Sequence, residues 1–313
     1  MKRVLSITLL FILVPSFFMF IIYKEEDKII SEVITKHITK KNKNEIFIKV
    51  KQTSKNKIIK VDLEEYVKGV IAGEMPVSFN IEALKAQAVA ARTYGVKRIN
   101  EKNTYDVVDT VMNQVYLDDD TLKIRWKTYY SIYKEKINKA VEETKGEYVD
   151  YNGTYADTLF FSTSTGYTEN SEEIFGNKVA YLRSVSSYWD EEESPVYEET
   201  TTFTREEFCK HLNMTDCSKI YINVLNETST GRIKKLTINN KTFTGTEVAY
   251  LLGVRSNYFN VKIVNNKVEV TTKGFGHGVG MSQYGANGMA NNGYTYKEIL
   301  EHYYQGTTIK KLY

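Results

Sequence analysis

The sequence contains little cysteine and little proline, and each shortage excludes a class of protein. Its 313 residues include two cysteines and three prolines. Two cysteines are too few for a disulfide-dense scaffold or for a four-cysteine zinc or iron–sulfur site. Three prolines exclude a proline-rich linker protein.

The sequence also lacks a large excess of either charge. Its 42 Lys and Arg residues face 39 Asp and Glu residues, a formal net charge of +3, and the positive residues are dispersed. We therefore expect no nucleic-acid partner, because binding to a phosphate backbone needs concentrated positive charge. Hydrophobic residues at 42% and charged residues at 26% are ordinary globular usage. The 24 tyrosines suit either a surface for planar polar ligands such as sugars or an aromatic core.

A long apolar run lies at the N-terminus. It follows Lys2-Arg3 and extends from Val4 to Tyr23. About 20 apolar residues span a bilayer as a helix, and no small-residue cleavage site follows this run. We expect residues 1–23 to be an uncleaved signal anchor whose N-terminus stays in the cytoplasm. The charged residues 24–44 would then form a linker stalk, and the following domain would lie outside the cytoplasm.

From residue 45 onward, strand and helix patterns are mixed without a regular βαβ rhythm, which predicts an α+β fold. Strand patterns at 46–50 and 58–61 precede helix patterns at 63–73 and 81–99. Asp62 is the expected N-cap of the first helix, and Asn152-Gly153 marks a hairpin turn. The later predicted segments are a helix at 123–143, a solvated acidic loop at 190–193, strands at 233–238 and 261–264, a short helix at 247–253, and a glycine-rich loop at 274–280 followed by helical signals.

Glu74 stands in Gly73-Glu74-Met75-Pro76, where the first predicted helix ends. The negative end of a helix and apolar neighbours both disfavour an ionised carboxylate. A glutamic acid that stays protonated near neutral pH is what a general acid acting on a glycosidic oxygen requires. A surface glutamate on a turn fits the same position, and these considerations leave both interpretations open.

Arg92 lies among small residues in Ala90-Ala91-Arg92-Thr93-Tyr94. A guanidinium with so little room to reach water is expected to pair with a carboxylate. Three roles remain open for it: orienting Glu74, holding the carboxyl group of a sugar acid, or forming a purely structural ion pair.

The block Gly274–Ala286 reads GFGHGVGMSQYGA. Its glycines allow backbone donors to approach a ligand, and Gln283 and Tyr284 suit hydroxyl or acetamido groups. It matches neither the phosphate-binding loop nor the dinucleotide-binding pattern. His277 on its own is a poor metal candidate, and packing or a single hydrogen bond is the simpler interpretation.

Several segments of the chain together resemble the stage II sporulation protein D family, which also includes the amidase-enhancer proteins. They are VKGVIAGEMPVSFNIEALKAQAVAARTYGVKR, FFSTSTGYTENSEEIFG, AYLRSV and GFGHGVGMSQYGA, in the family's order. The segment TGRIKKLTINNKTFTGTEVAYLLGVRS matches the family's second lobe. The resemblance implies a compact outer domain at 45–313 of mixed short strands and helices, with a smaller lobe at about 205–265, after one N-terminal transmembrane helix.

The resemblance further implies a peptidoglycan lytic transglycosylase that cleaves denuded glycan strands, free of stem peptides, to 1,6-anhydro-muramyl products during engulfment of the forespore. Glu74 would act first as general acid and then as base. The implied substrate-binding residues are Arg92, Ser162, Ser164, Tyr167, Tyr181, Tyr188, His277, Gln283 and Tyr284. The implied partners are glycan strands, a cell-wall amidase and a membrane scaffold protein, and the implied location is the mother-cell membrane around the forespore.

Two departures from the family pattern matter. Some members carry Cys-Asp-Thr-Thr-His-Cys before Gln-Val-Tyr and bind zinc there, whereas this chain has Val108-Asp109-Thr110-Val111-Met112-Asn113 before Gln114-Val115-Tyr116. Valine, methionine and asparagine do not replace two thiolates and an imidazole, so we predict no metal at this place and no cofactor. Phe161 stands where many relatives have histidine, which predicts a less polar contact.

Cys209 and Cys217 are the two cysteines. Outside the cell a disulfide between them is favoured, although sequence separation does not settle the geometry. With His211 they would make at most a three-ligand metal site.

Two further functions remain open. One is a non-catalytic wall-binding module that enhances an amidase. The other is a plain hydrolase, which needs a second carboxylate. Glu169, Glu172 and Glu173, near one of the matching segments, are candidates for it.

Overall fold

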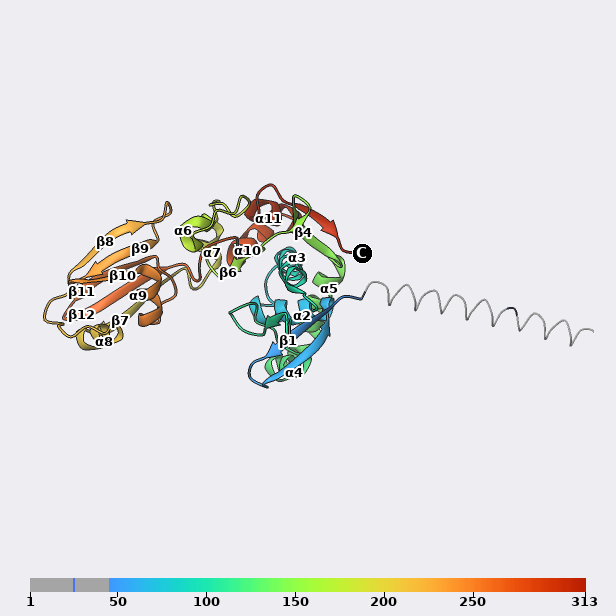
Figure 1. Cartoon of the computed structure of the whole chain (residues 1–313), viewed down its shortest axis with the longest axis horizontal. Helices are drawn as coiled ribbons and strands as arrows, with labels where there is room; N and C mark the ends of the chain where they lie inside the picture. Colours follow the sequence, from blue (N-terminus) through green and yellow to red (C-terminus); the bar gives the residue numbers. More distant parts are fainter. Residues whose placement is uncertain (1–24, 26–44) are drawn as a thin grey trace, which may run out of the picture. The chain divides into compact units, whose positions relative to one another are not determined.

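The computed structural model describes Glu25 and residues 45–313, and residues 47–312 form one compact unit (Figure 1). The predicted signal anchor at 1–23 and the predicted stalk, apart from Glu25, lie outside the described residues. Within the described part of the chain, no helix has the length and apolarity needed to cross a membrane.

The fold of the described residues is α+β, as the sequence predicts, and these residues form five small sheets rather than one large one. The first sheet has the order β2-β1-β3. Its strands are β1 (Phe47–Gln52), β2 (Lys57–Asp62) and β3 (Val107–Val108). The first two match the predicted strand patterns and pair antiparallel, and β3 adds in parallel to β1.

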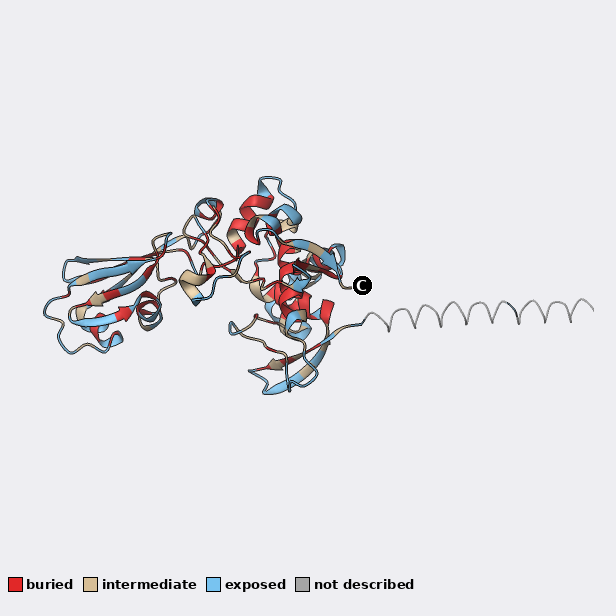
Figure 2. Cartoon of the chain, turned by 45° about the horizontal axis from the view of Figure 1, so that its top comes forward, coloured by how far each residue is buried: buried red, intermediate tan, exposed pale blue. Residues whose placement is uncertain are grey.

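Two helices at the centre carry the site described below. They are α2 (Leu63–Glu74) and α3 (Ile81–Arg98), close to the predicted ranges. The Asp62 side chain accepts from the amides of Glu64 and Glu65 and so caps α2. Most residues of α3 are buried (Figure 2), and its small residues Ala86 and Ala90 are fully buried. This helix contacts α2, α5 (Tyr130–Glu143), α10 (Gln283–Asn291), α11 (Tyr296–Tyr303) and β4 (Glu147–Tyr151).

The predicted helix at 123–143 is in fact interrupted. The segment forms α4 (Asp119–Trp126), the 3₁₀ turn η1 (Lys127–Tyr129) and α5 (Tyr130–Glu143). Lys127 has a φ of 48°, outside the helical region, and this ends α4. The apolar pattern of the sequence continues across the break. Trp126 at the end of α4 packs on Tyr133 of α5, with ring centroids 5.7 Å apart.

The middle of the chain forms short strands and helices. The predicted Asn152-Gly153 turn is present, with positive φ at both residues. It joins β4 to β5, and β14 completes that sheet in the order β14-β4-β5. The elements are β4 (Glu147–Tyr151), β5 (Thr154–Tyr155), β6 (Phe160–Phe161), α6 (Ser171–Phe175) and α7 (Trp189–Glu193).

The acidic run at 190–193, predicted to be a solvated loop, is part of the helix α7, and Asp190 is fully buried, whereas Glu191 and Glu192 are exposed as predicted. The Asp190 carboxylate accepts hydrogen bonds from the hydroxyls of Ser164, Ser187 and Ser282 at 2.6–2.8 Å. A buried carboxylate of this kind is tolerated because it is fully hydrogen-bonded. Burial raises its pKa, although these serine hydrogen bonds oppose the shift.

Residues 198–273 have a hydrophobic core of their own, which includes Phe208, Leu236 and Val268. Two three-stranded sheets, β10-β9-β8 and β11-β12-β7, and two helices surround it. The elements are β7 (Glu198–Thr204), α8 (Arg205–His211), β8 (Ile222–Glu227), β9 (Ile233–Ile238), β10 (Lys241–Thr244), α9 (Gly245–Leu252), β11 (Phe259–Val264) and β12 (Lys267–Lys273). This core falls in the region of the predicted second lobe, whose boundaries stay a prediction.

Cys209 and Cys217 form a disulfide in this region, with Cα atoms 6.1 Å apart. The favoured pairing is therefore confirmed.

The chain ends with β13 (Met281–Ser282), α10 (Gln283–Asn291), α11 (Tyr296–Tyr303) and β14 (Thr308–Lys311). β13 pairs in parallel with β6, which places the glycine-rich block beside the Ser162–Tyr167 segment. The two segments are far apart in sequence, and this pairing brings two of the resembling blocks together.

Candidate active site

Glu74 is the last residue of α2. The next residue, Met75, is extended, as a residue before proline must be, and its amide closes the helix on the Ile71 carbonyl at 2.9 Å. The Glu74 side chain is half-buried. The sequence-based position at the helix end is therefore confirmed.

An extended segment, residues 113–117, lies along the C-terminal half of α2. The Val115 amide donates to Glu74 Oε1 at 2.5 Å, and the Leu117 amide donates to the Gly69 carbonyl at 3.2 Å. Gly69 and Gly73 permit this approach: a Cβ on Gly73 would lie 2.5 Å from the Val115 carbonyl oxygen. The two glycines, four residues apart, thus give α2 a surface without side chains, against which this segment packs.

The environment of Glu74 favours its protonated form. Burial raises the pKa of the carboxyl above its ordinary value, and the hydrogen bond from the Val115 amide partly opposes this shift. A carboxyl group with a raised pKa keeps its proton to higher pH than a solvated glutamate. It can then act as a general acid closer to neutral pH.

A polar network that the sequence analysis missed holds this segment in place. Asn113 accepts from the Val108 amide at 2.9 Å and donates to the Tyr94 hydroxyl at 2.9 Å. The Tyr66 hydroxyl donates to Gln114 Oε1 at 2.9 Å. Burial raises the pKa of Tyr66, and the nearby Glu74 charge adds to the shift, so this hydroxyl remains a neutral donor. Asn113 and Gln114 therefore hold the segment in place by hydrogen bonds.

Arg92 does not orient Glu74 in this structure. Its guanidinium is fully buried and pairs with Glu64, with Nη2 2.6 Å from Glu64 Oε2. A second donor, Nη1, reaches the Glu147 carbonyl at 3.0 Å. Of the three roles left open by the sequence, the structural ion pair is the one observed, and the substrate-binding role stays a prediction.

The predicted substrate-binding residues Ser162, Ser164 and Gln283 differ in how far they are buried. Ser164 is fully buried against Asp190, and Gln283 is nearly so, whereas Ser162 is half-buried. The Ser162 carbonyl accepts from the Tyr284 amide at 3.1 Å. Ser162 thus ties the two blocks together, and Ser164 serves the buried network rather than an open surface.

Tyr284 of the glycine-rich block contacts the segment that follows Glu74 in the sequence. Its ring packs edge-on against Phe79, with centroids 4.9 Å apart, and Phe79 lies in the segment that follows Glu74 and Pro76. Nearby, the Asn80 amide donates to Asn287 Oδ1 at 2.8 Å. The structure therefore joins the first and last resembling blocks.

The three candidate tyrosines differ in access. Tyr167 and Tyr188 expose 56% and 61% of their surface, so both are available to a ligand. Tyr188 stacks on Trp189 at 4.2 Å between centroids. Tyr181 is buried and its hydroxyl accepts from the Asp157 amide at 2.7 Å, so it has a structural role here. Its predicted glycan contact stays a prediction.

His277 is held in a neutral state. Its Nδ1 accepts from the Val279 amide at 3.1 Å, and its ring packs between those of Phe161 and Phe175. Burial and the nearby Arg232 charge lower its pKa to about 4. The packing role is the one observed, and Phe161 supplies an apolar face to it.

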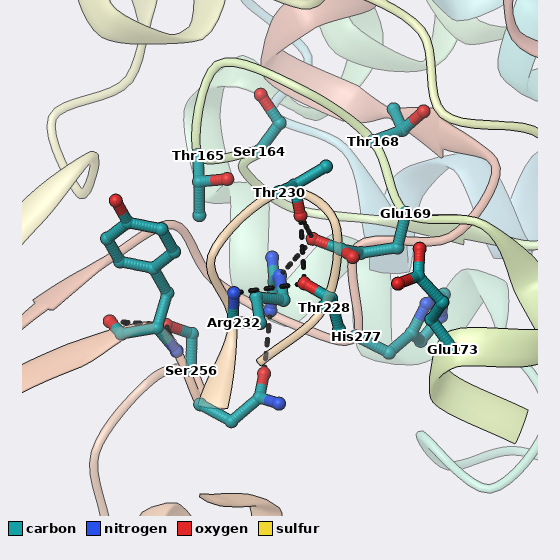
Figure 3. Close-up of polar contacts among 12 residues, drawn as sticks. Ser164, Thr165, Thr168, Glu169, Glu173, Thr228, Thr230, Arg232, Ser256 and His277 are labelled. Atoms are coloured by element: carbon teal, nitrogen blue, oxygen red, sulfur yellow. Dashed lines mark hydrogen bonds and ion pairs between the residues drawn. The ribbon is translucent and has the colours of Figure 1, made fainter. Parts of the chain in front are cut away.

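The three glutamates considered as a second catalytic carboxylate all form ion pairs or hydrogen bonds with other residues. Figure 3 shows Glu169 facing Arg232 and Thr230, and both members of the Glu169–Arg232 pair are fully buried, with Nε 3.1 Å from Oε1. The ion pair with Arg183 lowers the pKa of Glu172 to about 2. The Ser229 amide donates to Glu173 at 2.7 Å. None of these three carboxylates is bonded to Glu74 or to the segment around it.

Among the described residues, no group of three His, Cys, Asp or Glu side chains is placed to hold a metal ion. The prediction that the Val108–Tyr116 stretch binds no zinc rests on its residue types and stays a prediction.

Comparison with known proteins identifies relatives over most of the chain. The sequence profile of the family described as "Stage II sporulation protein" matches residues 51–151, which include Glu74, Arg92 and Val115. Stage II sporulation protein D of Bacillus subtilis is 43% identical over 273 residues, covering 85% of this chain and 79% of that protein. The same protein of Bacillus amyloliquefaciens is 41% identical with the same coverage. The amidase enhancer of Bacillus subtilis is 32% identical over 78% of this chain and 40% of its own length.

Proposed function

Because this chain belongs to the stage II sporulation protein D family, we propose that it is a peptidoglycan lytic transglycosylase that acts during sporulation. The observation that carries the proposal is the environment of Glu74. Its carboxyl is half-buried at the end of α2, has a raised pKa, and bonds a backbone amide through one oxygen. Such a group can donate a proton to a glycosidic oxygen near neutral pH.

One carboxyl group is sufficient for the proposed reaction. Protonated Glu74 gives its proton to the oxygen that leaves the anomeric carbon of a muramyl residue. The 6-hydroxyl of the same sugar attacks that carbon, and the Glu74 carboxylate takes the hydroxyl proton. The glycosidic bond breaks, a 1,6-anhydro ring forms, Glu74 is protonated again, and no water is consumed.

The substrate and location extend the same proposal. We take the substrate to be denuded strands, from which an amidase has removed the stem peptides. Residues 1–23 would anchor the domain at the mother-cell membrane around the forespore, with an amidase and a membrane scaffold protein as partners. The exposed rings of Tyr167 and Tyr188 and the Tyr284 side chain next to Phe79 are the proposed glycan contacts.

Product analysis tests the proposal. The full chain in detergent micelles is incubated with denuded and with intact peptidoglycan, beside the Glu74→Gln variant. A glutamine keeps an acceptor for the Val115 amide but carries no proton to donate. Anhydro-muramyl ends from the wild type alone, on denuded strands, are expected. Equal release of these ends by the variant would remove the assignment of Glu74.

A second function, enhancement of an amidase without cleavage, is favoured by the relative named amidase enhancer. Under this alternative, Glu74→Gln would still bind glycan and still raise the rate of a cell-wall amidase, while neither protein forms anhydro ends. Amidase stimulation that survives the substitution, in the absence of any cleavage by the wild type, would replace the first proposal with the second.

A further inference from the structure

A pocket of about 430 Å³ lies between elements that the proposed reaction does not use, and Glu74 is not among its lining residues. It is lined by α6, by α9, by the loop after α9 and by the glycine-rich loop at Gly276-His277. This volume lies within the range of small-molecule sites in proteins. None of its lining residues belongs to α2 or to residues 113–117, so it is built separately from the Glu74 site.

Two of the residues that line this pocket are aromatic and have largely exposed side chains. Tyr250 of α9 is 84% exposed and Phe175 of α6 is 51% exposed. Both line the pocket. Apolar rings left in water cost free energy, and rings at the wall of a pocket typically serve a ligand with a planar apolar face. A pyranose ring offers such a face with polar groups around its edge.

Hydrogen bonds connect several of the residues that line the pocket. Arg232, fully buried, donates through Nη1 to the Gly276 carbonyl at 2.8 Å and to Asn257 Oδ1 at 3.1 Å. The Gly276 amide donates in turn to the Arg255 carbonyl at 3.1 Å. Gly276, Asn257 and Arg255 all line the pocket. These three residues are therefore held in position before any ligand binds, which lowers the entropy cost of binding.

Arg255 is the cationic residue among the described residues that line the pocket. It pairs with Glu199 through Nε at 2.8 Å and lies 5.7 Å from the centroid of the Phe275 ring. Glu199 is contacted through Nε, so a ligand carboxylate would meet the guanidinium at its terminal nitrogens, Nη1 and Nη2. Among the described residues that line the pocket, none carries a carboxyl group. A guanidinium fork in such a setting suits a carboxylate ligand.

We propose that this pocket is a second glycan subsite, which takes one N-acetylmuramic acid residue of a denuded strand. Tyr250 and Phe175 pack on its ring, and Arg255 binds its lactyl carboxylate. That carboxylate is an amide in intact peptidoglycan and becomes free only when an amidase removes the stem peptide. The subsite thus recognises the amidase product. The proposal rests on the proposed glycan substrate but not on the reaction at Glu74.

Binding without cleavage provides the test. The full chain carrying Glu74→Gln, in detergent micelles, is titrated with denuded strands and with the same strands after their lactyl carboxylates are converted to methylamides. Arg255→Gln, Arg255→Lys and Tyr250→Ala are added to this background. Arg125→Gln, on an exposed residue of α4, is the matched control, and melting temperatures confirm that each variant is folded.

The parent is expected to bind carboxylate strands about tenfold more tightly than methylamide strands. Arg255→Gln should bind both kinds equally, Arg255→Lys should keep part of the difference, and Arg125→Gln should keep all of it. Tyr250→Ala should weaken both strands by the same factor, roughly threefold to tenfold.

Discrimination that persists in Arg255→Gln, or its absence in the parent, overturns the subsite, as does unchanged binding by Tyr250→Ala. The outcome is separate from that of the cleavage test. Anhydro products without discrimination would remove only the subsite. Discrimination without anhydro products would leave the subsite as part of a binding protein and remove the transglycosylase.

Discussion

At the scale of single residues, the account depends on where two charged side chains are placed. Partial burial of Glu74 favours its protonated form, although the hydrogen bond from the Val115 amide opposes this shift. Arg92 is fully buried but is neutralised by Glu64. Glu74 is therefore suited to proton transfer, whereas Arg92 is held in a buried ion pair.

The raised pKa of Glu74 predicts how activity depends on pH. Cleavage needs the protonated acid, so kcat/KM should fall as pH rises through the Glu74 pKa, with a midpoint above the ordinary value for glutamate. A pH–rate profile on denuded strands measures this midpoint. A fall centred at the ordinary value of a solvated glutamate would contradict the account of the site.

The same shift predicts the sign of a stability change. A group whose pKa is raised in the folded state stabilises the fold below its unfolded pKa, and this contribution is lost as pH rises through the folded pKa. Wild type should therefore lose stability relative to Glu74→Gln between the ordinary glutamate pKa and the raised one. Melting temperatures of the two proteins across pH check this, and parallel curves would oppose it.

The ion pair of Arg92 predicts a cost for its removal. Arg92→Ala should destabilise the protein by about 3–5 kcal/mol, because the Glu64 carboxylate loses its buried guanidinium. Lys68→Ala, which breaks a more exposed pair with Glu65, should cost about 0–1 kcal/mol. Chemical denaturation measures both values.

A double variant separates structure from substrate binding at Arg92. Arg92→Met with Glu64→Leu replaces the pair by apolar groups and should recover much of the stability. We expect activity to recover with it. Restored stability with absent activity would return Arg92 to the substrate-binding residues.

At the scale of elements, the site is a contact between α2 and residues 113–117. Gly69 and Gly73 let this segment lie against the helix, and the Val115 amide then meets Glu74. Asn113 fixes the start of the segment through Val108 and Tyr94. The Val108–Asn113 stretch is thus held in place by amide and hydroxyl groups in this chain.

This arrangement predicts that Asn113 is a positioning residue for Glu74. Asn113→Ala should loosen the Val115 amide, and the Glu74 pKa should rise further because that hydrogen bond lowers it. The pH–rate profile should then fall at higher pH than in the wild type, with activity reduced roughly tenfold. Val111→Ala, an exposed residue of the same loop, is the control. Reduced activity with an unmoved profile would mean that Asn113 acts only on stability.

The residue types of the same stretch predict independence from zinc. Incubation with EDTA, followed by removal of the chelator, should leave melting temperature and glycan cleavage unchanged, since Val108, Met112 and Asn113 offer no thiolate or imidazole. Metal analysis of the purified protein accompanies the assay. A loss of activity that zinc restores would contradict this prediction.

At the scale of the whole molecule, part of the arrangement was predictable from the sequence. The Asp62 cap, the ranges of α2 and α3 and the α+β class follow from local patterns, which depend on neighbours a few residues apart. The end of α2 at Glu74 follows from Pro76 for the same reason. These features also placed the candidate acid correctly on its helix.

Other features depend on contacts between distant segments and left no local signal. Asp190 lies in an acidic run that is typical of a solvated loop, yet Ser164 and Ser282 meet it from separate parts of the chain. Glu64 resembles an exposed first-turn glutamate, and only the packing of α2 on α3 makes it the partner of Arg92. The break at Lys127 likewise interrupts an apolar pattern that continues across it.

The central claim is that one carboxyl group, Glu74, drives a cleavage that consumes no water. The most direct measurement is mass spectrometry of the glycan ends formed from denuded strands in water labelled with heavy oxygen, by the full chain and by Glu74→Gln. We predict anhydro ends without the heavy isotope from the wild type and none from the variant. Reducing ends that carry the heavy isotope, or equal products from the two proteins, would contradict it.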